Sequence, residues 1–167
     1  LNDNGFYRKG IQQGPLAFLS CLDKLMSYYP IRRNAKLSNF IQFMEQDLKT
    51  IKDMGGLSSI GNGAFVQCFR DESVASTDPS SFIKMIEQSA YDNFLKYMGT
   101  KESKEPRIFL SVFSAISKLP DNKCFQGLRM NLVLFEGLQS AVKVIKPYGD
   151  FTMDEELTCF IYKEGDY

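Results

Sequence analysis

The chain has 167 residues, of which 44% are hydrophobic and 24% are charged, and it contains no histidine. This length fits one domain, and the composition is ordinary for a globular protein. The 20 basic residues balance the 20 acidic ones, so no overall field draws the chain to nucleic acid. The missing histidine excludes Ser-His-Asp and Cys-His catalysis, histidine-ligated zinc and a haem held by histidine. We therefore expect a binding or assembly protein, with no catalytic residue, metal site or cofactor.

The four cysteines, at 21, 68, 124 and 159, are scattered and show neither a CxxC pair nor metal-ligand spacing. Each lies among apolar residues, which is typical of buried free thiols in a reducing compartment. No signal-peptide pattern opens the sequence, and no apolar run approaches the roughly 18 residues of a membrane-spanning helix. These features favour a cytoplasmic protein, with a secreted one as the alternative if a leader has been removed.

The first two thirds of the sequence carry helical patterns. Residues 1–14 are mostly polar and predict an N-terminal arm in front of a single domain over residues 15–167. Apolar residues then recur with helical spacing over three segments, 15–29, 37–54 and 58–70. A fourth helix is predicted from Pro79 to about Met98, because Asp78 is a good N-cap and proline is favoured at the first helical position.

The pattern changes after residue 106. The dense apolar run at 108–113 has strand propensity, and a helix is predicted over 125–140. Two strands follow, at 142–146 and 157–163, and in the second Leu157, Cys159 and Ile161 share one face. We therefore expect an α+β fold, in which helices pack on one face of a small antiparallel β-sheet that ends in a C-terminal β-hairpin.

Local motifs favour structural roles over chemistry. The glycines around Gly55-Gly56 and Gly61-Asn62-Gly63 match neither a Walker loop nor a dinucleotide loop, so helix ends or close packing are favoured. Cys68 has no neighbour that would lower its pKa, which favours a core cysteine over a nucleophile. The acids at 154–156 lack the spacing of a calcium loop, and Arg32-Arg33 is favoured as a surface loop.

Three stretches together resemble the small core subunits of the TRAPP vesicle-tethering complex, over about residues 37–163. The first is the pair Met54-Gly55 and Ile60-Gly61 with the amphipathic run after it, and the second is the segment 90–99. In the third, a strand leads to residues 119–122 (Leu-Pro-Asp-Asn), a long helix and a closing strand. The cysteine acylated in one branch of the family would fall near Thr77, so acylation is not expected here.

The resemblance implies an α+β fold with a four-stranded antiparallel sheet, and subunits that dimerise through helical faces. The assembled complex would act as an exchange factor for a Rab-type GTPase in transport between the ER and the Golgi, with peripheral membrane association. The partners would be other protein subunits, in a homodimer or heterodimer, and the single subunit would catalyse nothing. We name four interface positions on this basis: Phe65, Phe69, and the small residues Gly137 and Ala141 on one predicted helix.

Two alternatives remain from the sequence. The helices rich in Phe and Met predict, as one alternative, an apolar channel that binds a small molecule or a lipid. The other alternative is an interaction protein of viral or parasite origin, which sequence pattern does not distinguish from a tethering subunit.

Overall fold

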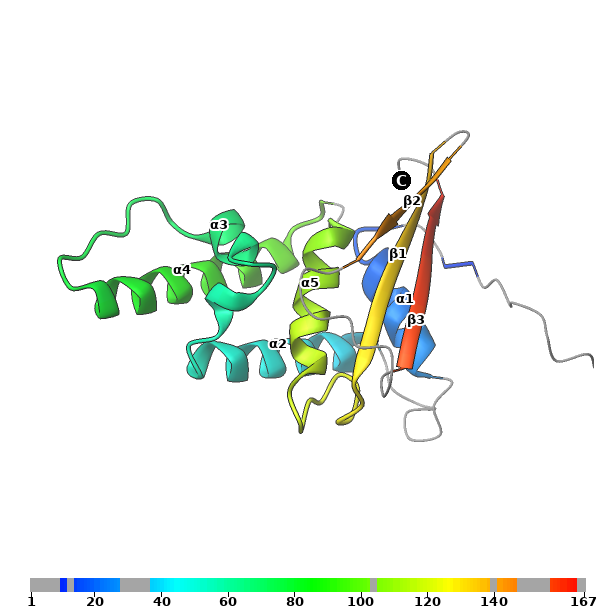
Figure 1. Cartoon of the computed structure of the whole chain (residues 1–167), viewed down its shortest axis with the longest axis horizontal. Helices are drawn as coiled ribbons and strands as arrows, with labels where there is room; N and C mark the ends of the chain where they lie inside the picture. Colours follow the sequence, from blue (N-terminus) through cyan, green and yellow to red (C-terminus); the bar gives the residue numbers. More distant parts are fainter. Residues whose placement is uncertain are drawn as a thin grey trace, which may run out of the picture.

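The computed structural model describes residues 10–11, 14–27, 37–102, 105–138, 141–146 and 157–164. In this part of the chain the helices precede the strands. Their bounds are α1 Ala17–Met26, α2 Leu37–Asp53, the 3-10 turn η2 Leu57–Ser59, α3 Ala64–Phe69, α4 Pro79–Gly99, α5 Pro106–Ser117, β1 Met130–Leu138, β2 Ala141–Ile145 and β3 Leu157–Glu164. Figure 1 shows the sheet at one end of an elongated body, with α2 and α4 extending away from it. The α+β fold class is confirmed.

The start of α4 follows its sequence signal closely. The side chain of Asp78 accepts a hydrogen bond from the Ser81 amide at 2.8 Å, and Pro79 occupies the first turn. Hydrogen bonds from Ser81 first, and then from Ser80, lower the pKa of the Asp78 carboxyl from 3.8 to about 2. Asp78 therefore caps the helix in its charged, carboxylate form.

A pH titration tests this cap. Because the pKa of Asp78 is lower in the folded state, its contribution to stability is complete above about pH 4 and is lost as the pH falls towards 2. We expect the side-chain NMR signal of Asp78 to titrate near pH 2. The stability difference between wild type and Asp78→Ala should shrink over the same range. A midpoint near 3.8 would contradict the capping bond.

The sheet is mixed, and this corrects the expected antiparallel sheet with a C-terminal hairpin. Its order is β2-β1-β3, with β1 antiparallel to β2 and parallel to β3. Only two residues separate β1 from β2, which is the length of a tight hairpin loop. The eleven residues between β2 and β3 are longer than such a loop, and the last strand pairs with β1 instead. The hairpin is therefore β1–β2.

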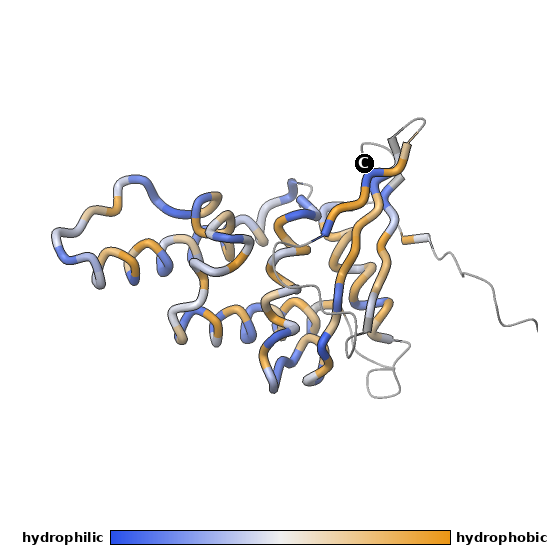
Figure 2. Tube along the Cα trace, viewed as in Figure 1, coloured by the Kyte–Doolittle hydropathy of each residue, from blue (hydrophilic) through white to orange (hydrophobic). Residues whose placement is uncertain are grey.

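Two segments exchange the structures predicted for them. The run from 107 to 117 is helix α5 rather than a strand, and its buried residues Phe109, Val112, Phe113 and Ile116 follow helical spacing. The predicted helix over 125–140 contains strand β1 instead. Figure 2 shows that this central strand is hydrophobic along most of its length. Because apolar residues lie on both of its faces, they also occur at helical spacing, and this led to the prediction of a helix.

The core lies between α5 and the elements around it. Phe113 of α5 stacks on Phe40 of α2 with ring centroids 5.5 Å apart, and it meets Phe125 at 5.8 Å. On the sheet side, Met130, Leu132 and Leu134 of β1 belong to the same cluster of buried residues. Because side chains alternate along a strand, the intervening residues of β1, Asn131, Val133, Phe135 and Gly137, point to the opposite side of the sheet.

Candidate functional site

The side of the sheet that faces away from α5 carries exposed apolar residues. We define the outer face by these four exposed residues, Val142 and Val144 of β2 and Phe160 and Tyr162 of β3, together with the half-buried Phe135 of β1. Phe135 is the register partner of both Val144 and Tyr162, so these three form a row across all the strands. The exposed fractions are 61% for Phe160, 55% for Val142, 50% for Val144 and 49% for Tyr162.

The helices that the structure describes leave the outer face open. Figure 1 shows α5 against the other side of the sheet, and the exposure of the strand residues agrees with this. The open part lies toward the β1–β2 hairpin. At the opposite end of the same face, Asn131 and Val133 of β1 are buried. A contiguous apolar patch of this kind is typical of a surface that meets a partner.

The aromatic residues of the outer face pack on one another. The rings of Phe135 and Phe160 lie 5.7 Å apart between centroids. Tyr162 leans along the sheet over Gly137, where a Cβ atom would lie only 2.5 Å from the tyrosine hydroxyl oxygen. Glycine at position 137 therefore gives Tyr162 the space for its ring, and the two residues form one packed unit.

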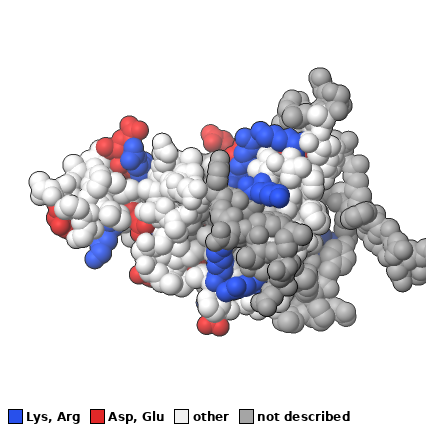
Figure 3. Space-filling view, in the orientation of Figure 1, with Lys and Arg blue, Asp and Glu red and all other residues white. Residues whose placement is uncertain are grey.

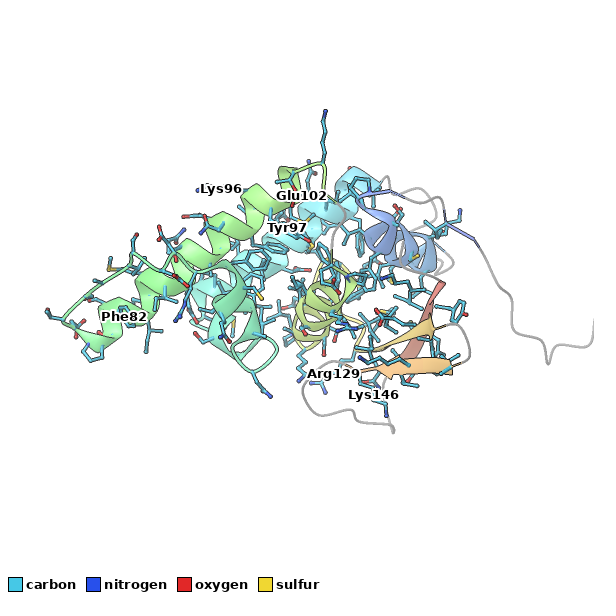
Figure 4. All side chains as sticks on the ribbon, turned by 90° about the horizontal axis from the view of Figure 1, so that it is seen from above. Phe82, Lys96, Tyr97, Glu102, Arg129 and Lys146 are labelled. Atoms are coloured by element: carbon cyan, nitrogen blue, oxygen red, sulfur yellow. The ribbon has the colours of Figure 1, made fainter. Side chains whose placement is uncertain are left out.

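Basic residues lie around the sheet, but two of them, Lys143 and Lys163, are register partners of Glu136 and so share its side of the sheet, opposite the outer face. Among the described side chains of the strands and their flanking residues, four are basic and one, Glu136, is acidic; the basic ones are Arg129, Lys143, Lys146 and Lys163. Glu136 accepts a 3.0 Å hydrogen bond from Arg107 of α5, which neutralises it. Figure 3 shows Lys and Arg gathered where α5 meets β2, and Figure 4 places Arg129 and Lys146 at the β2 side of the sheet.

A second candidate is a cavity of about 460 Å³ over the turn that leads into β1. Its lining is largely the turn itself, Pro120 to Lys123 with Gln126 and Gly127, together with Phe43 of α2. This lining differs from the Phe- and Met-rich channel of the small-molecule alternative. Asp121 is the one carboxylate that lines the cavity, so it brings no pair of acids together.

Two buried carboxylates have a structural role, because each accepts hydrogen bonds from a neighbouring loop. Asp47 of α2 accepts hydrogen bonds from the amides of Lys123 and Cys124, the latter at 2.8 Å. Glu87 of α4 accepts two from Ser58, at 2.8 Å from the amide and 2.7 Å from the hydroxyl. Sequence reasoning missed both, because an acid on a helix normally reads as part of a solvated face.

Burial disfavours the reactive thiolate form at two of the cysteines. Burial raises the pKa of Cys159 to about 11 and also raises that of Cys21. Cys124 is buried as expected, whereas Cys68 is exposed, contrary to the expected core position. The short helix α3 turns Phe65 and Val66 inward, which leaves Cys68 on its solvent side.

Within the described ranges, no group of three or more Cys, Asp or Glu residues is placed to hold a metal ion. None of the helices in those ranges combines the length and apolarity needed to cross a membrane.

The four predicted interface residues do not share a surface. Phe65 is buried and Phe69 half-buried, and both rings pack on Phe94, at 5.2 and 5.3 Å between centroids. The placement of Gly137 and Ala141 on one helix is wrong, because they lie on β1 and β2. By strand alternation Gly137 belongs to the outer face, whereas Ala141 lies on the opposite side.

These observations define an α+β protein that exposes apolar residues on one face of its sheet. No model of a known protein family matches the chain, and comparisons with curated proteins and with solved structures likewise give no match. The resemblance to TRAPP subunits therefore stays a prediction.

Proposed function

We propose that this chain is a non-catalytic subunit of a protein assembly, which it joins through the outer face of its sheet. The observation that carries the proposal is the exposure of Phe160 and Tyr162 on a continuous apolar row of three strands. Aromatic residues dominate the affinity of many protein interfaces, because they bury a large area at a small cost in side-chain entropy. The contact is therefore assigned to the sheet rather than to a helix face.

For the biological setting, we propose a cytoplasmic vesicle-tethering assembly that acts on a Rab-type GTPase in ER–Golgi transport. The support for this setting is the resemblance around Met54-Gly55, Ile60-Gly61 and the segment 90–99. The third stretch of the resemblance gives less support, since residues 106–117 are helical and 130–138 form a strand. The interaction role rests on the outer face and does not depend on this setting.

Co-purification from cells that naturally produce the chain tests the interaction role. We expect the tagged wild type to retain partner subunits, and the double variant Phe160→Ser, Tyr162→Ser to lose them by about tenfold or more. Both residues are exposed, Phe160 to 61% and Tyr162 to 49%, so the variant should keep its fold, which thermal melting checks.

Met54→Ser is the matched control, because Met54 is 73% exposed and lies on the segment after α2, outside the sheet. The control should retain the same partners as the wild type. Equal recovery of partners with the double variant would contradict the proposed function. A Rab-type GTPase among the retained proteins, with faster nucleotide exchange, would support the setting.

A further inference from the structure

We propose that a partner protein adds a strand to the β2 edge, the side of Ala141–Ile145 that faces away from β1, and that this strand alternates apolar and acidic residues. The contact goes beyond the proposed function, because it uses the backbone of β2 rather than Phe160 and Tyr162. Three observations carry it: the hydrogen-bonding groups that β2 directs away from β1, its two exposed valines and the charge of Lys143 on its other side.

The pairing of β2 with β1 fixes which backbone groups reach the β2 edge. Leu138 and Ala141 flank a loop of two residues, so they form a hydrogen-bonded pair, and hydrogen-bonded and non-hydrogen-bonded pairs alternate from there. Val142 and Val144 therefore occupy non-hydrogen-bonded positions of the β1–β2 ladder. Their amides and carbonyls point away from β1, to the β2 edge.

The β2 edge is open among the described residues. Within them the strand order is β2-β1-β3, so β2 pairs on one side only, and Figure 1 shows it at the border of the sheet. None of their other backbone hydrogen bonds includes Val142 or Val144. A row of open amides and carbonyls is a template for a further strand, because an extended segment satisfies both kinds of group. A helix satisfies its backbone groups internally and offers none to an edge.

The two sides of β2 set the side-chain pattern of the added strand. Val142 and Val144 belong to the outer face and are 55% and 50% exposed, so apolar residues would lie beside them. Lys143 points to the opposite side, is exposed, and takes part in no ion pair among the described residues. Its register partner Glu136 is bound to Arg107 by a 3.0 Å ion pair. An acidic residue beside Lys143 would therefore match a charge that the chain itself leaves uncompensated.

The same lysine disfavours a second copy of this chain as the occupant. Two β2 edges could pair antiparallel with Val142 of one copy bound to Val144 of the other. This register would place the two Lys143 residues directly opposite each other, ~4.5 Å apart between Cα atoms. Like charges at this position repel, and lysine on an edge strand guards natural sheets against self-association. An acidic strand is attracted instead, so the partner is a different protein.

Short extended peptides provide the probe. We would titrate the isotope-labelled full chain with a peptide of about seven residues that alternates valine and glutamate, and with one in which lysine replaces glutamate. The glutamate peptide should shift the NMR amide signals of Val142 and Val144, and the lysine peptide should bind about tenfold more weakly or less. Hydrogen exchange should be fast at these two amides until the peptide binds, whereas the amide of Lys143, which bonds to β1, should be protected throughout.

Backbone methylation of the peptide distinguishes strand addition from side-chain contact. We would methylate the glutamate peptide on its valine nitrogens in one version and on its glutamate nitrogens in another. Only one set of nitrogens faces β2, so only one version should lose binding, by about tenfold or more. Loss with methylated valines indicates an antiparallel strand, and loss with methylated glutamates a parallel one. The same response of both versions would overturn strand addition.

Variants of the chain assign the binding to the β2 edge. Val144→Pro removes one edge amide but no hydrogen bond to β1, and proline is tolerated on edge strands. It should weaken the glutamate peptide about tenfold, whereas Val144→Thr, which keeps the amide, should stay within about threefold of the wild type. Lys143→Glu should reverse the preference between the two charged peptides, and the exposed Lys84→Glu outside the sheet should not. Thermal melting checks each fold, and the peptide series decides even if Val144→Pro unfolds.

The other outcomes each contradict the inference. Unchanged signals of Val142 and Val144 up to about 1 mM glutamate peptide exclude the added strand, and equal binding of both charged peptides excludes its acidic residues. Protection of both amides in the chain alone would show that the β2 edge is already occupied. A dimer in light scattering would then assign it to a second copy, and a monomer to another segment of this chain. The co-purification test depends on Phe160 and Tyr162, so the proposed function stands or fails separately.

Discussion

Asp47→Ala is expected to lower the free energy of unfolding by about 2–5 kcal/mol. Asp47 is 3% exposed and accepts hydrogen bonds from the amides of Lys123 and Cys124. Alanine would remove the acceptor that both amides share, and the loss of the acceptor of a buried amide costs about 1–3 kcal/mol. Urea unfolding followed by circular dichroism measures the loss.

The matched control is Asp121→Ala, which removes an exposed acid from the same turn. This variant should stay within about 0.5 kcal/mol of the wild type. Hydrogen exchange adds a local readout, because the amides of Lys123 and Cys124 should lose protection in Asp47→Ala before the helices do. A change below 1 kcal/mol in Asp47→Ala would show that the turn holds without its carboxylate.

Phe113→Ala is the second large effect, with an expected loss of about 3–5 kcal/mol. Phe113 is fully buried, and its ring packs on Phe40, Phe109 and Phe125, at 5.5, 6.3 and 5.8 Å between centroids. Truncation therefore removes apolar contact with α2, with its own helix and with the segment before β1. The cavity left behind adds to the loss of transfer free energy, because the surrounding rings close it only in part.

Phe113→Leu tests whether the loss of stability depends on the side-chain volume at position 113. Leucine keeps most of the apolar volume and should cost well under half of the alanine loss. The exposed Phe160 provides the comparison at the surface, where Phe160→Ala should change stability by less than about 1 kcal/mol. If Phe113→Ala were as mild as Phe160→Ala, α5 would not be the centre of the core.

The sequence predicts the helices of the first half well, because their periodicity and caps are local signals. Asp78 and Pro79 start α4 where their chemistry requires it. The second half fails for a physical reason. The apolar run of α5 is dense enough to imitate a strand, and central strand β1 is apolar on both faces and imitates a helix. Tertiary burial decided both, because the local pattern of each segment is compatible with the competing structure as well.

The sequence predicted the β3 part of the candidate site but not the parts on β1 and β2. Alternation along the last strand predicts that Cys159 and Ile161 share one face, and the structure turns that face toward the core, which leaves Phe160 and Tyr162 on the other side. The sequence did not reveal that β1 would supply Phe135 between them and Val144, because this depends on the pairing of strands far apart in the chain. Asp47 and Glu87 were also missed, since their partners lie in distant loops.

The contact between Tyr162 and Gly137 has an evolutionary consequence. A side chain at position 137 and the tyrosine ring compete for one volume, given the 2.5 Å approach of the hydroxyl. The two positions are thus expected to covary: descendants of this sequence that gain a larger residue at 137 should shorten the residue at 162. A substitution at one position would therefore be tolerated only together with a matching substitution at the other, although 24 residues separate the two along the chain.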